Sequence, residues 1–159
     1  MEPLMLITAE IEQGFQAEHE TVTAQLDLTS AYNHVEHYKL LDAMRELGIP
    51  PVYARFFKAF LRGRSFRVRF GRALSRWAKE KCGVPQGAVS SPPLFNIYME
   101  LIVRSVARAR AALNIGMSGF ADDYQLYCIG PDLPTLAHNL SEFLTVHLLP
   151  ALTLSLIHI

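Results

Sequence analysis

Apolar residues recur along this chain with two different periods, and the period separates predicted helices from predicted strands. Over residues 4–17 they recur every three or four positions, which predicts an amphipathic helix. Over residues 22–28 every second residue is apolar, which predicts a buried strand. The N-terminal part of the chain is therefore expected to form a helix followed by a strand.

Local signals at the ends of the next apolar stretches predict two further helices. Asn33 and Glu36 have the spacing of a capping box, with Asn in place of Ser or Thr, and predict a helix that ends at Gly48. Pro51 fits the first turn of the following helix, which is expected to stop near Gly63.

The second half of the chain is predicted to contain strands and two more helices. Apolar residues alternate with arginines over residues 66–70, which predicts a strand with a partner near residues 74–81. Ser-Pro-Pro at residues 91–93 predicts the start of a long helix. A hairpin around residues 122–123 and a helix from about residue 133 to residue 147 follow.

Composition places the chain among globular domains, and its charges are segregated. The 159 residues are one domain by length, or part of a larger one, and half of them are apolar. The formal net charge is zero, but residues 62–81 carry eight Lys and Arg side chains against Glu80 alone. Such a stretch can hold phosphates, and the alternative is an ordinary solvated strand face. The candidate nucleic-acid-binding residues are Arg62, Arg64, Arg67 and Arg69.

The cysteines and histidines argue against several classes of site. Cys82 and Cys128 form no C-x-x-C pair, so neither a disulfide framework nor a zinc site is predicted, and a reducing compartment fits. His34 and His37 can share a helix face but lack Cys, Asp or Glu at ligand spacing. No stretch approaches the length of a membrane span, and the acidic start is unlike a signal peptide.

Acidic residues mark the ends of two apolar stretches that lie far apart in the sequence. Asp122 and Asp123 stand at a strand–turn–strand junction, where adjacent carboxylates repel each other unless a cation lies between them and a third acid. Asp27 is the candidate for that third acid. Two strand-borne acidic sites suggest a two-metal phosphoryl-transfer centre. The alternatives are a helix cap for Asp27 and an ordinary Asp turn for the pair.

Three segments, in this order and spacing, resemble the catalytic motifs of reverse transcriptases. Residues 27–33, Asp-Leu-Thr-Ser-Ala-Tyr-Asn, are similar to the first motif, Asp-x-x-x-Ala-Phe/Tyr-Asp. Residues 83–96, which begin Gly-Val-Pro-Gln-Gly, resemble the next motif in the form used by non-LTR (LINE-type) retrotransposons. Residues 120–123, Phe-Ala-Asp-Asp, resemble the third motif as a variant of Tyr-Ala-Asp-Asp. The resemblance covers roughly residues 4–145.

The resemblance implies a site of carboxylates that bind two Mg²⁺ ions, with Mn²⁺ as the alternative ion. It implies that Asp27 and Asp122 bridge both ions, that Asp123 contributes less directly, and that the backbone carbonyl of Leu28 adds one ligand. Tyr32 would lie under the incoming sugar and exclude a 2′-hydroxyl. Without the motif, an aromatic residue there would more often belong to the core.

The loop that opens the second motif is expected to contact nucleotides. The resemblance places Pro85, Gln86 and Gly87 against the template base and the incoming nucleotide, where glycine permits a close approach and proline stiffens the loop. The alternative is a plain strand-to-helix turn. Asn33 and Ala88 depart from the family's usual Asp and Ser, as Ser90 and Pro93 do from its usual Leu, and none of these departures removes a metal ligand.

The implied fold is α+β: a polymerase palm-like antiparallel sheet with helices packed on one face, with incomplete fingers and no thumb. Residues 1–150 would be a partial reverse transcriptase domain, comprising the palm and part of the fingers at most. Residues 151–159 are interpreted as a non-native or truncated tail, and a translated sequencing adapter is one source of such a sequence.

The implied function is that of an RNA-directed DNA polymerase of a retrotransposon. Its partners would be an RNA template, a DNA primer and deoxynucleoside triphosphates, without a membrane, and its oligomeric state stays open. The 159 residues alone are expected to be inactive, and a nuclear location would suit a retrotransposon enzyme. The alternatives are a non-catalytic reverse-transcriptase-like remnant or scaffold, and a reverse transcriptase of the group II intron maturase type.

Overall fold

The chain folds into two compact units, one formed by its two ends and one by its middle. The computed structural model describes residues 3–120 and 123–154. The first unit comprises residues up to 31 together with those from 101 onward, and the second comprises residues 32–100. None of the helices in the described ranges is long and apolar enough to cross a membrane.

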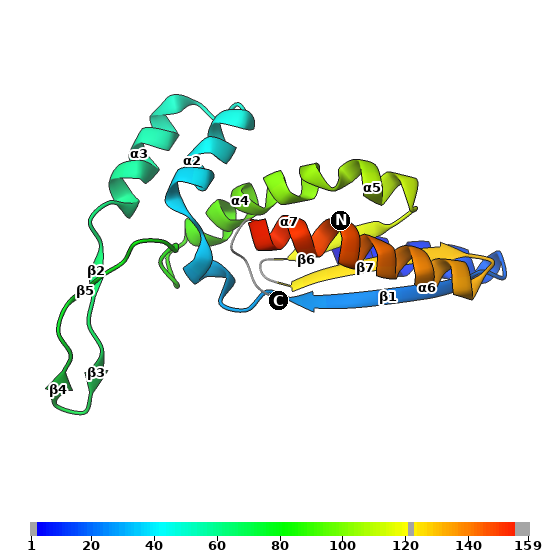
Figure 1. The fold of residues 1–159 in the computed structure, drawn as a ribbon, viewed down its shortest axis with the longest axis horizontal. Helices are drawn as coiled ribbons and strands as arrows, with labels where there is room; N and C mark the ends of the chain where they lie inside the picture. Colours follow the sequence, from blue (N-terminus) through cyan, green and yellow to red (C-terminus); the bar gives the residue numbers. More distant parts are fainter. Residues whose placement is uncertain (1–2, 121–122, 155–159) are drawn as a thin grey trace. The chain divides into compact units, whose positions relative to one another are not determined.

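A three-stranded antiparallel sheet forms the centre of the first unit (Figure 1). Its strands are β1 (Glu20–Asp27), β6 (Gly116–Phe120) and β7 (Asp123–Gly130), and their order in the sheet is β1-β7-β6. β7 pairs with β1 along its whole length and with β6 over five residues. The strand predicted over residues 22–28 is observed as β1, although Val22, Ala24 and Leu26 are only partly buried. The antiparallel pairing of β6 with β7 agrees with the predicted hairpin, whose residues 121 and 122 lie outside the described residues.

Helices of the first unit surround this sheet. They are α1 (Pro3–Gln16), α5 (Ala107–Ala112), α6 (Leu133–Glu142), the π-helical segment η2 (Phe143–Leu148) and α7 (Leu149–Leu154). Asp132 caps α6: its carboxylate accepts the Thr135 N–H at 3.0 Å, and hydrogen bonds from the Thr135 side chain and backbone lower its pKa. The buried side chains of Leu140, Phe143 and Leu148 hold the C-terminal helical segments in the core.

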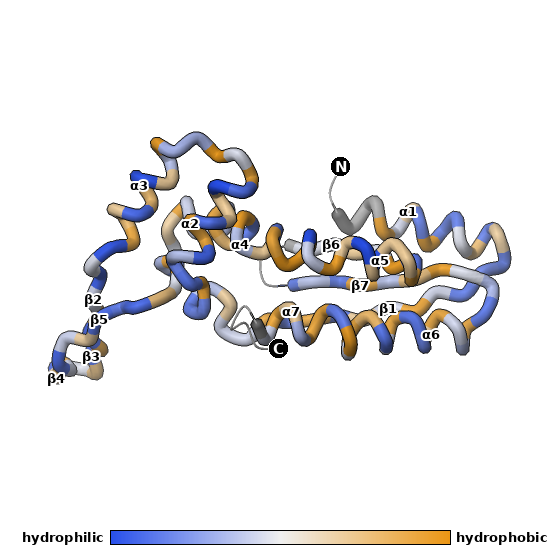
Figure 2. The backbone as a smooth tube through the Cα atoms, turned by 45° about the horizontal axis from the view of Figure 1, so that its top comes forward, coloured by the Kyte–Doolittle hydropathy of each residue, from blue (hydrophilic) through white to orange (hydrophobic). Residues whose placement is uncertain are grey.

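Helices cover both faces of the sheet, so the prediction of helices on one face is wrong. The Tyr127 hydroxyl donates to Glu10 of α1 at 2.5 Å, whereas the thiol of the next residue, Cys128, donates to the Leu136 carbonyl of α6 at 3.3 Å. Because consecutive strand residues point to opposite faces, α1 and α6 lie on opposite sides of β7 (Figure 2). The central strand β7 is accordingly buried on both faces, at Leu126, Tyr127 and Cys128.

Two helices form the start of the second unit. They are α2 (His37–Glu46) and α3 (Pro51–Leu61), preceded by the short 3₁₀ helix η1 (Ala31–His34). Gly48, with φ +71°, ends α2 in a Schellman motif: the Gly48 and Ile49 N–H groups donate to the carbonyls of Arg45 and Met44. The predicted stop at Gly48 is thereby confirmed.

The predicted capping box of Asn33 and Glu36 is wrong. Asn33 lies inside η1, and Glu36 is the N-cap residue of α2 but makes no side-chain capping hydrogen bond. The Glu36 carboxylate instead pairs with Lys39 at 2.8 Å, and the hydrogen bonds from Lys39 and Tyr38 lower its pKa. Asn33 and Glu36 have the spacing of a capping box. However, residues 31–34 form the 3₁₀ helix η1, so Asn33 does not occupy the N-cap position of α2.

A long, broken hairpin and the start of another helix complete the second unit (Figure 1). β2 (Ser65–Phe66) pairs with β5 (Ala78–Lys79), and β3 (Arg69–Phe70) pairs with β4 (Ala73–Leu74). The hairpin predicted from residues 66–81 is confirmed. α4 (Ser91–Ser105) begins at the predicted position and continues into the residues of the first unit.

Candidate active site

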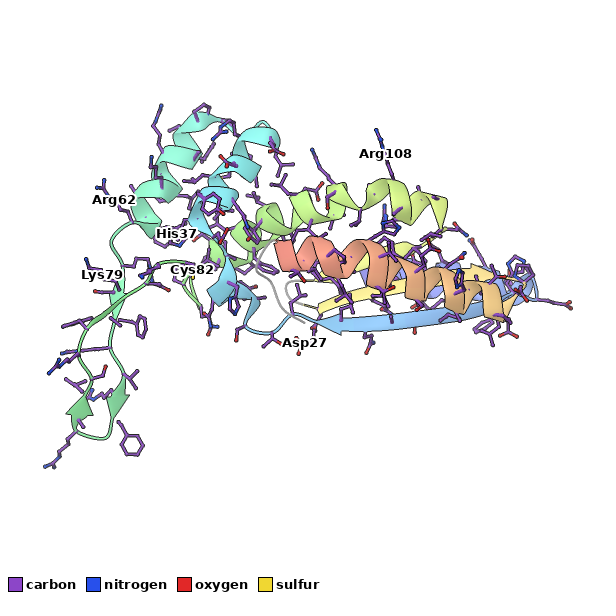
Figure 3. All side chains as sticks on the ribbon, viewed as in Figure 1. Asp27, His37, Arg62, Lys79, Cys82 and Arg108 are labelled. Atoms are coloured by element: carbon purple, nitrogen blue, oxygen red, sulfur yellow. The ribbon has the colours of Figure 1, made fainter. Side chains whose placement is uncertain are left out.

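Two of the predicted catalytic carboxylates lie opposite each other at one end of the sheet. β1 ends at Asp27, which Figure 3 labels, and β7 begins at Asp123. The antiparallel register makes these two residues direct cross-strand partners. Both are exposed. The Cβ atoms of directly opposed residues stand about 4.5–5.5 Å apart, and like charges in this arrangement destabilise a sheet. A bound cation would remove that repulsion.

Asp122, the third predicted carboxylate, lies outside the described residues and precedes Asp123 in the sequence. In the described ranges, which leave out residues 121 and 122, no group of three His, Cys, Asp or Glu residues is arranged to hold a metal ion. The donors that are described nevertheless have suitable chemistry. Two carboxylates held on strand ends are the hard oxygen ligands that Mg²⁺ prefers.

The chain leaves β1 through a tight turn that fixes the Leu28 carbonyl. The Leu28 side chain is buried, and its carbonyl oxygen accepts the Ala31 N–H at 3.2 Å. Ser30, the third residue of this turn, has φ +52°, in the left-handed region, which is typical of that position in some turns and not of a strand. A carbonyl oxygen has a second lone pair, so the Leu28 carbonyl retains the capacity to accept a metal ion.

In the second unit, Tyr32 lies against the loop that resembles the second motif. Its backbone carbonyl accepts the Val84 N–H at 2.8 Å, and its ring stacks on Phe95 of α4, with centroids 5.1 Å apart and planes at 28°. The structure thus brings together two segments, around residues 32 and 84, that the sequence analysis assigned to one nucleotide site.

The loop itself is anchored at both ends and exposed between them. Gly83 donates its N–H to the Val35 carbonyl at 2.7 Å, and His37 Nε2 donates to the Gly83 carbonyl at 2.7 Å. The buried Ser91 hydroxyl donates to the Pro85 carbonyl at 2.6 Å. Gln86 and Gly87 between these anchors are exposed, and Gly87 has φ +83°. A preformed loop of this kind can present Gln86 without further ordering.

Sequence reasoning missed the two side chains that hold this loop. His37 was considered only as a metal ligand, and Ser91 only as the start of a helix. Both act through hydrogen bonds to a loop carbonyl, and the His37 bond spans 46 residues of sequence, which no local pattern reveals. Gly83 also has a specific role: a Cβ there would lie 3.1 Å from the carbonyl oxygens of Tyr32 and Asn33.

The four candidate phosphate-binding arginines lie on or next to the hairpin of the second unit, and they differ in their partners. Arg62 is exposed at the C-cap of α3, and Arg69 is exposed on β3 (Arg62 is labelled in Figure 3). Arg64 pairs with Glu80 at 2.8 Å and is only partly exposed. Arg67 stacks over the Trp77 ring at 4.7 Å. Glu80, the only acid in residues 62–81, therefore pairs with Arg64, and the other cations of these residues can bind an anion.

Comparison with known proteins tests the resemblance read from the three motifs. The family model described as "Reverse transcriptase (RNA-dependent DNA polymerase)" matches residues 3–148. The chain belongs to the reverse transcriptase family. This match spans every predicted catalytic and nucleotide-contacting residue, from Asp27 to Asp123.

Individual relatives come from mobile elements of insects. The chain is 30% identical over 76% of its length to a "Retrovirus-related Pol polyprotein from type-1 retrotransposable element R2" of Nasonia vitripennis. It is 28% identical over 91% of its length to a "Probable RNA-directed DNA polymerase from transposon BS" of Drosophila melanogaster. A similar protein from transposon X-element of the same fly is 31% identical over 62% of the chain.

These relatives confirm the resemblance to reverse transcriptases of non-LTR retrotransposons. The chain spans 12% of the length of the R2 relative and 16% of that of the BS relative. Reverse transcriptases as a family use divalent metal ions, which agrees with the chemistry of the opposed carboxylates.

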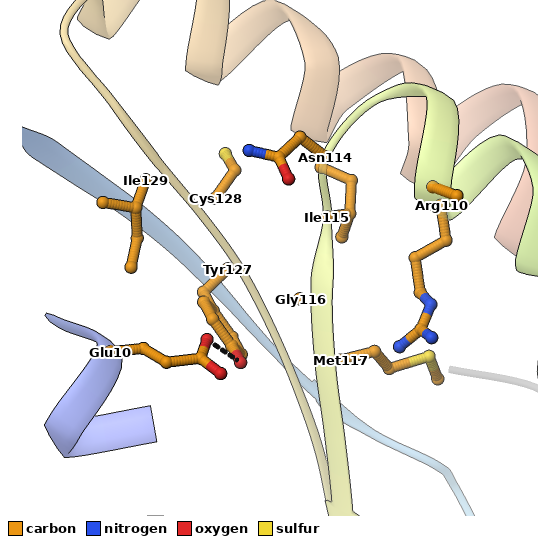
Figure 4. Close-up of a pocket in the computed structure, with 10 residues that line it drawn as sticks. Glu10, Arg110, Asn114, Ile115, Gly116, Met117, Tyr127, Cys128 and Ile129 are labelled. Carbon is orange, nitrogen blue, oxygen red and sulfur yellow. Dashed lines mark hydrogen bonds between the residues drawn. The ribbon is translucent and has the colours of Figure 1, made fainter. Parts of the chain in front are cut away.

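A separate cavity lies within the first unit of this reverse transcriptase chain, between α1 and the hairpin of β6 and β7 (Figure 4). Its volume is about 350 Å³, and its polar lining includes Glu10, Arg110 and Asn114. The Tyr127 hydroxyl bonds to Glu10 at its wall. Burial first, and then this hydrogen bond, raise the pKa of Tyr127 to about 12. None of the predicted site residues lines this cavity.

Proposed function

We propose that this chain supplies catalytic carboxylates to an RNA-directed DNA polymerase encoded by a non-LTR retrotransposon. One observation carries the proposal: Asp27 and Asp123 face each other across the β1–β7 pair, with Asp122 next in the sequence. Residues separated by nearly a hundred positions thereby present like charges at one end of the sheet. A fold retains this arrangement where a cation is to be bound.

The reaction would transfer a nucleotidyl group to a primer. The primer 3′-hydroxyl attacks the α-phosphorus of a deoxynucleoside triphosphate, the new phosphodiester bond forms, the bond to the β-phosphate breaks, and pyrophosphate leaves. Two Mg²⁺ ions, or Mn²⁺ in their place, supply activation of the hydroxyl and neutralisation of the charge on the phosphates. The protein contributes the ligands and holds them on rigid strand ends, which lowers the cost of reorganisation.

We assign a role to each residue of the carboxylate site. Asp27 and Asp122 would hold both ions, Asp123 would support the site less directly, and the Leu28 carbonyl would be a further ligand. The opposed positions of Asp27 and Asp123 and the fixed carbonyl of Leu28 support this assignment.

The second unit would recognise the nucleotide. We propose that Tyr32 selects deoxyribose by excluding a 2′-hydroxyl, and that Pro85, Gln86 and Gly87 contact the template base and the incoming nucleotide. Support comes from the anchored loop, whose exposed Gln86 and Gly87 lie between hydrogen bonds made by Gly83 and Ser91. Arg62, Arg64, Arg67 and Arg69 are proposed phosphate contacts for the RNA template or DNA primer.

We further propose that residues 1–150 act as part of a reverse transcriptase domain, a palm with at most part of the fingers, and that they do not extend primers alone. The length of the relatives supports this proposal: the chain spans 12% of the R2 relative and 16% of the BS relative. Residues 151–154 belong to α7 and Leu152 is buried, and residues 155–159 lie outside the described residues. A non-native or truncated origin of residues 151–159 therefore stays a prediction.

Calorimetric titration of Mg²⁺ and Mn²⁺ into the 159-residue protein tests the carboxylate site. Binding should be lost or weakened at least tenfold in Asp27→Asn and in Asp123→Asn. Glu20→Gln is the matched control, because Glu20 is an equally exposed acid at the other end of β1, opposite Gly130. Equal ion binding by all four proteins would refute the site. Absence of binding in the parent protein would favour the alternative of a non-catalytic remnant, which the departures at Asn33 and Ala88 also suit.

A further inference from the structure

The hairpin of the second unit exposes a set of large apolar side chains. Phe70 is 88% exposed, Trp77 64%, Val68 61% and Phe66 52%. A ribbon of short strand pairs cannot bury these side chains by itself, since β2 pairs only with β5 and β3 only with β4. Exposed aromatic residues gathered on one element mark an interaction surface.

The same hairpin is strongly basic, and its cations are largely unpaired. Residues 62–81 contain eight Lys and Arg side chains and one acid, Glu80, which pairs with Arg64. Within the described part of the chain, no ion pair involves the other seven cations. Charge complementarity therefore favours a polyanion over an apolar or neutral protein partner.

One face of this hairpin carries an aromatic ring among its cations. The guanidinium of Arg67 lies over the Trp77 ring at 4.7 Å, and Arg69 is paired across the strands with Leu74. Cross-strand partners project from the same face of a hairpin, so Arg67 and Arg69 share one face with Trp77 and Leu74. Phe66, Val68 and Phe70 alternate with these arginines and therefore project from the other face. A flexible ligand that carries both flat apolar groups and negative charges can contact the cations of the first face and the exposed rings of both.

A hollow lies at the base of the hairpin. It has a volume of about 540 Å³ and is lined by Phe66, Lys79, Lys81 and Asn33, with Glu80 and Cys82 completing its wall. Figure 3 labels Lys79 and Cys82 at this base. A nucleotide presents a base for a phenylalanine ring and a phosphate for two lysines, and Asn33 is the next residue after Tyr32, the proposed sugar contact.

We propose that this basic–aromatic hairpin, residues 62–81, binds an unpaired polynucleotide strand by stacking bases on Trp77 on its basic face and on Phe66 and Phe70 on the opposite face. The inference rests on the proposed function for the choice of a polynucleotide, and it adds the strand type and the aromatic contacts. Base faces are accessible only in unpaired strands, whereas a duplex would engage the cations alone. The bound segment would be a single-stranded part of a template.

Fluorescence of the 159-residue protein tests this directly, because Trp77 is its single tryptophan. Addition of a 20-nucleotide oligo(dT) or oligo(U) should quench Trp77, and the two arms distinguish DNA from RNA. A duplex of the same length should quench it far less. The logarithm of the affinity should fall with the logarithm of salt with a slope of about −0.7 per phosphate contacted.

Matched variants separate stacking from charge. Phe70→Ala should weaken single-strand binding roughly fivefold or more, as loss of one base-stacking contact does. Arg69→Ala should weaken it and reduce the salt slope, whereas Arg108→Ala, which removes an equally exposed arginine from α5, should leave both unchanged. Circular dichroism confirms that each variant is folded.

Several results would overturn the inference. These are an unquenched Trp77 while the oligonucleotide binds, equal binding of duplex and single strand, or Phe70→Ala binding as tightly as Arg108→Ala. Light scattering adds another: a dimer that Phe70→Ala dissociates would make the hairpin a contact between copies of the chain. Titrations in EDTA with Asp27→Asn keep the two proposals apart, since quenching must not depend on that carboxylate even if the metal site fails.

Discussion

At the scale of single residues, the pairing of Asp27 with Asp123 has a consequence that can be measured without any substrate. Two like charges opposite each other on neighbouring strands destabilise the sheet in the absence of a cation. The sequence predicted that distant acids would meet, because each ends or begins an apolar strand. It could not give the register that makes Asp123 the direct partner of Asp27.

Asp27→Asn should therefore stabilise the metal-free protein. The expected gain is roughly 0.2–1 kcal/mol in the free energy of unfolding, the range for cross-strand charge pairs. Urea denaturation in EDTA measures it, and saturating Mg²⁺ should abolish the gain because the parent protein then binds the ion. Glu20→Gln, opposite Gly130, should show no gain in either condition. A less stable Asp27→Asn protein in EDTA would contradict the repulsion.

Because of Tyr127, the free energy of unfolding should depend on pH in the alkaline range. Its pKa is raised from 10.0 to about 12, so the unfolded chain loses the phenolic proton before the native protein does. The native state then binds more protons, and stability must fall as pH rises from about 10 to about 12. The loss should be roughly 3 kcal/mol, from 1.36 kcal/mol for each of about two pKa units.

Denaturant unfolding of the parent and Tyr127→Phe proteins between pH 9 and pH 12 checks this. Other groups titrate in the same range, so the difference between the two proteins carries the information. Tyr127→Phe should be less stable at pH 9, where it lacks the hydrogen bond to Glu10, and the gap should close by pH 12. Parallel stability curves would show that Tyr127 titrates as it does in the unfolded chain.

Tyr32 is predicted to select the sugar of the incoming nucleotide. In a longer retrotransposon protein that contains this chain, Tyr32→Ala should admit ribonucleotides, because the aromatic ring no longer excludes the 2′-hydroxyl. Single-nucleotide primer extension with matched deoxyribonucleotides and ribonucleotides measures the discrimination. Tyr38→Ala, which removes an exposed tyrosine from α2, is the control. Unchanged discrimination in Tyr32→Ala would leave the ring with its stacking contact to Phe95 as its role.

At the scale of elements, periodicity and stop signals located most helices and strands. They failed where a side-chain pairing or the burial of a strand decided the outcome. Glu36 was assigned to a capping box, but its carboxylate pairs with Lys39 and the helix begins after it. The resemblance implied helices on one face of the sheet, whereas β7 is buried on both faces. The exposure of Phe66, Val68 and Phe70 was equally hidden, since alternation alone does not say what covers the apolar face.

The hairpin of β6 and β7 depends on glycines that accommodate tyrosine rings. Gly116 pairs with Tyr127 and Gly119 with Tyr124, and a Cβ on either glycine would overlap the ring of its partner. Gly116→Ala should therefore destabilise the protein by about 1–3 kcal/mol, the usual cost of overpacking. Thermal and urea unfolding measure the loss. In the Tyr127→Ala background the same substitution should cost much less, and an equal cost in both backgrounds would exclude the steric explanation.

At the scale of the whole molecule, the predicted site residues divide between two units. The carboxylates and the Leu28 carbonyl belong to the first, and Tyr32 and the loop at residues 83–87 belong to the second. The formal net charge of zero conceals a comparable division, because the basic hairpin lies wholly within the second unit. Motif order indicated that these parts serve one reaction. The side chains that anchor the loop at residues 83–87, His37 and Ser91, could be identified only from the contacts in the folded structure.

Activity is therefore expected of a longer protein and not of these 159 residues alone. In a retrotransposon protein that contains this chain, Asp122→Asn should abolish primer extension, because one of the charges proposed to bridge the two metal ions is lost. The isolated chain should bind divalent ions through Asp27 without extending a primer. Extension assays on an RNA template measure both, with Asp42→Asn, an exposed acid on α2 paired with Arg45, as the control. Asp122→Asn activity within tenfold of the parent would remove that residue from the reaction, and processive extension by the isolated chain would show that the matched residues suffice for catalysis.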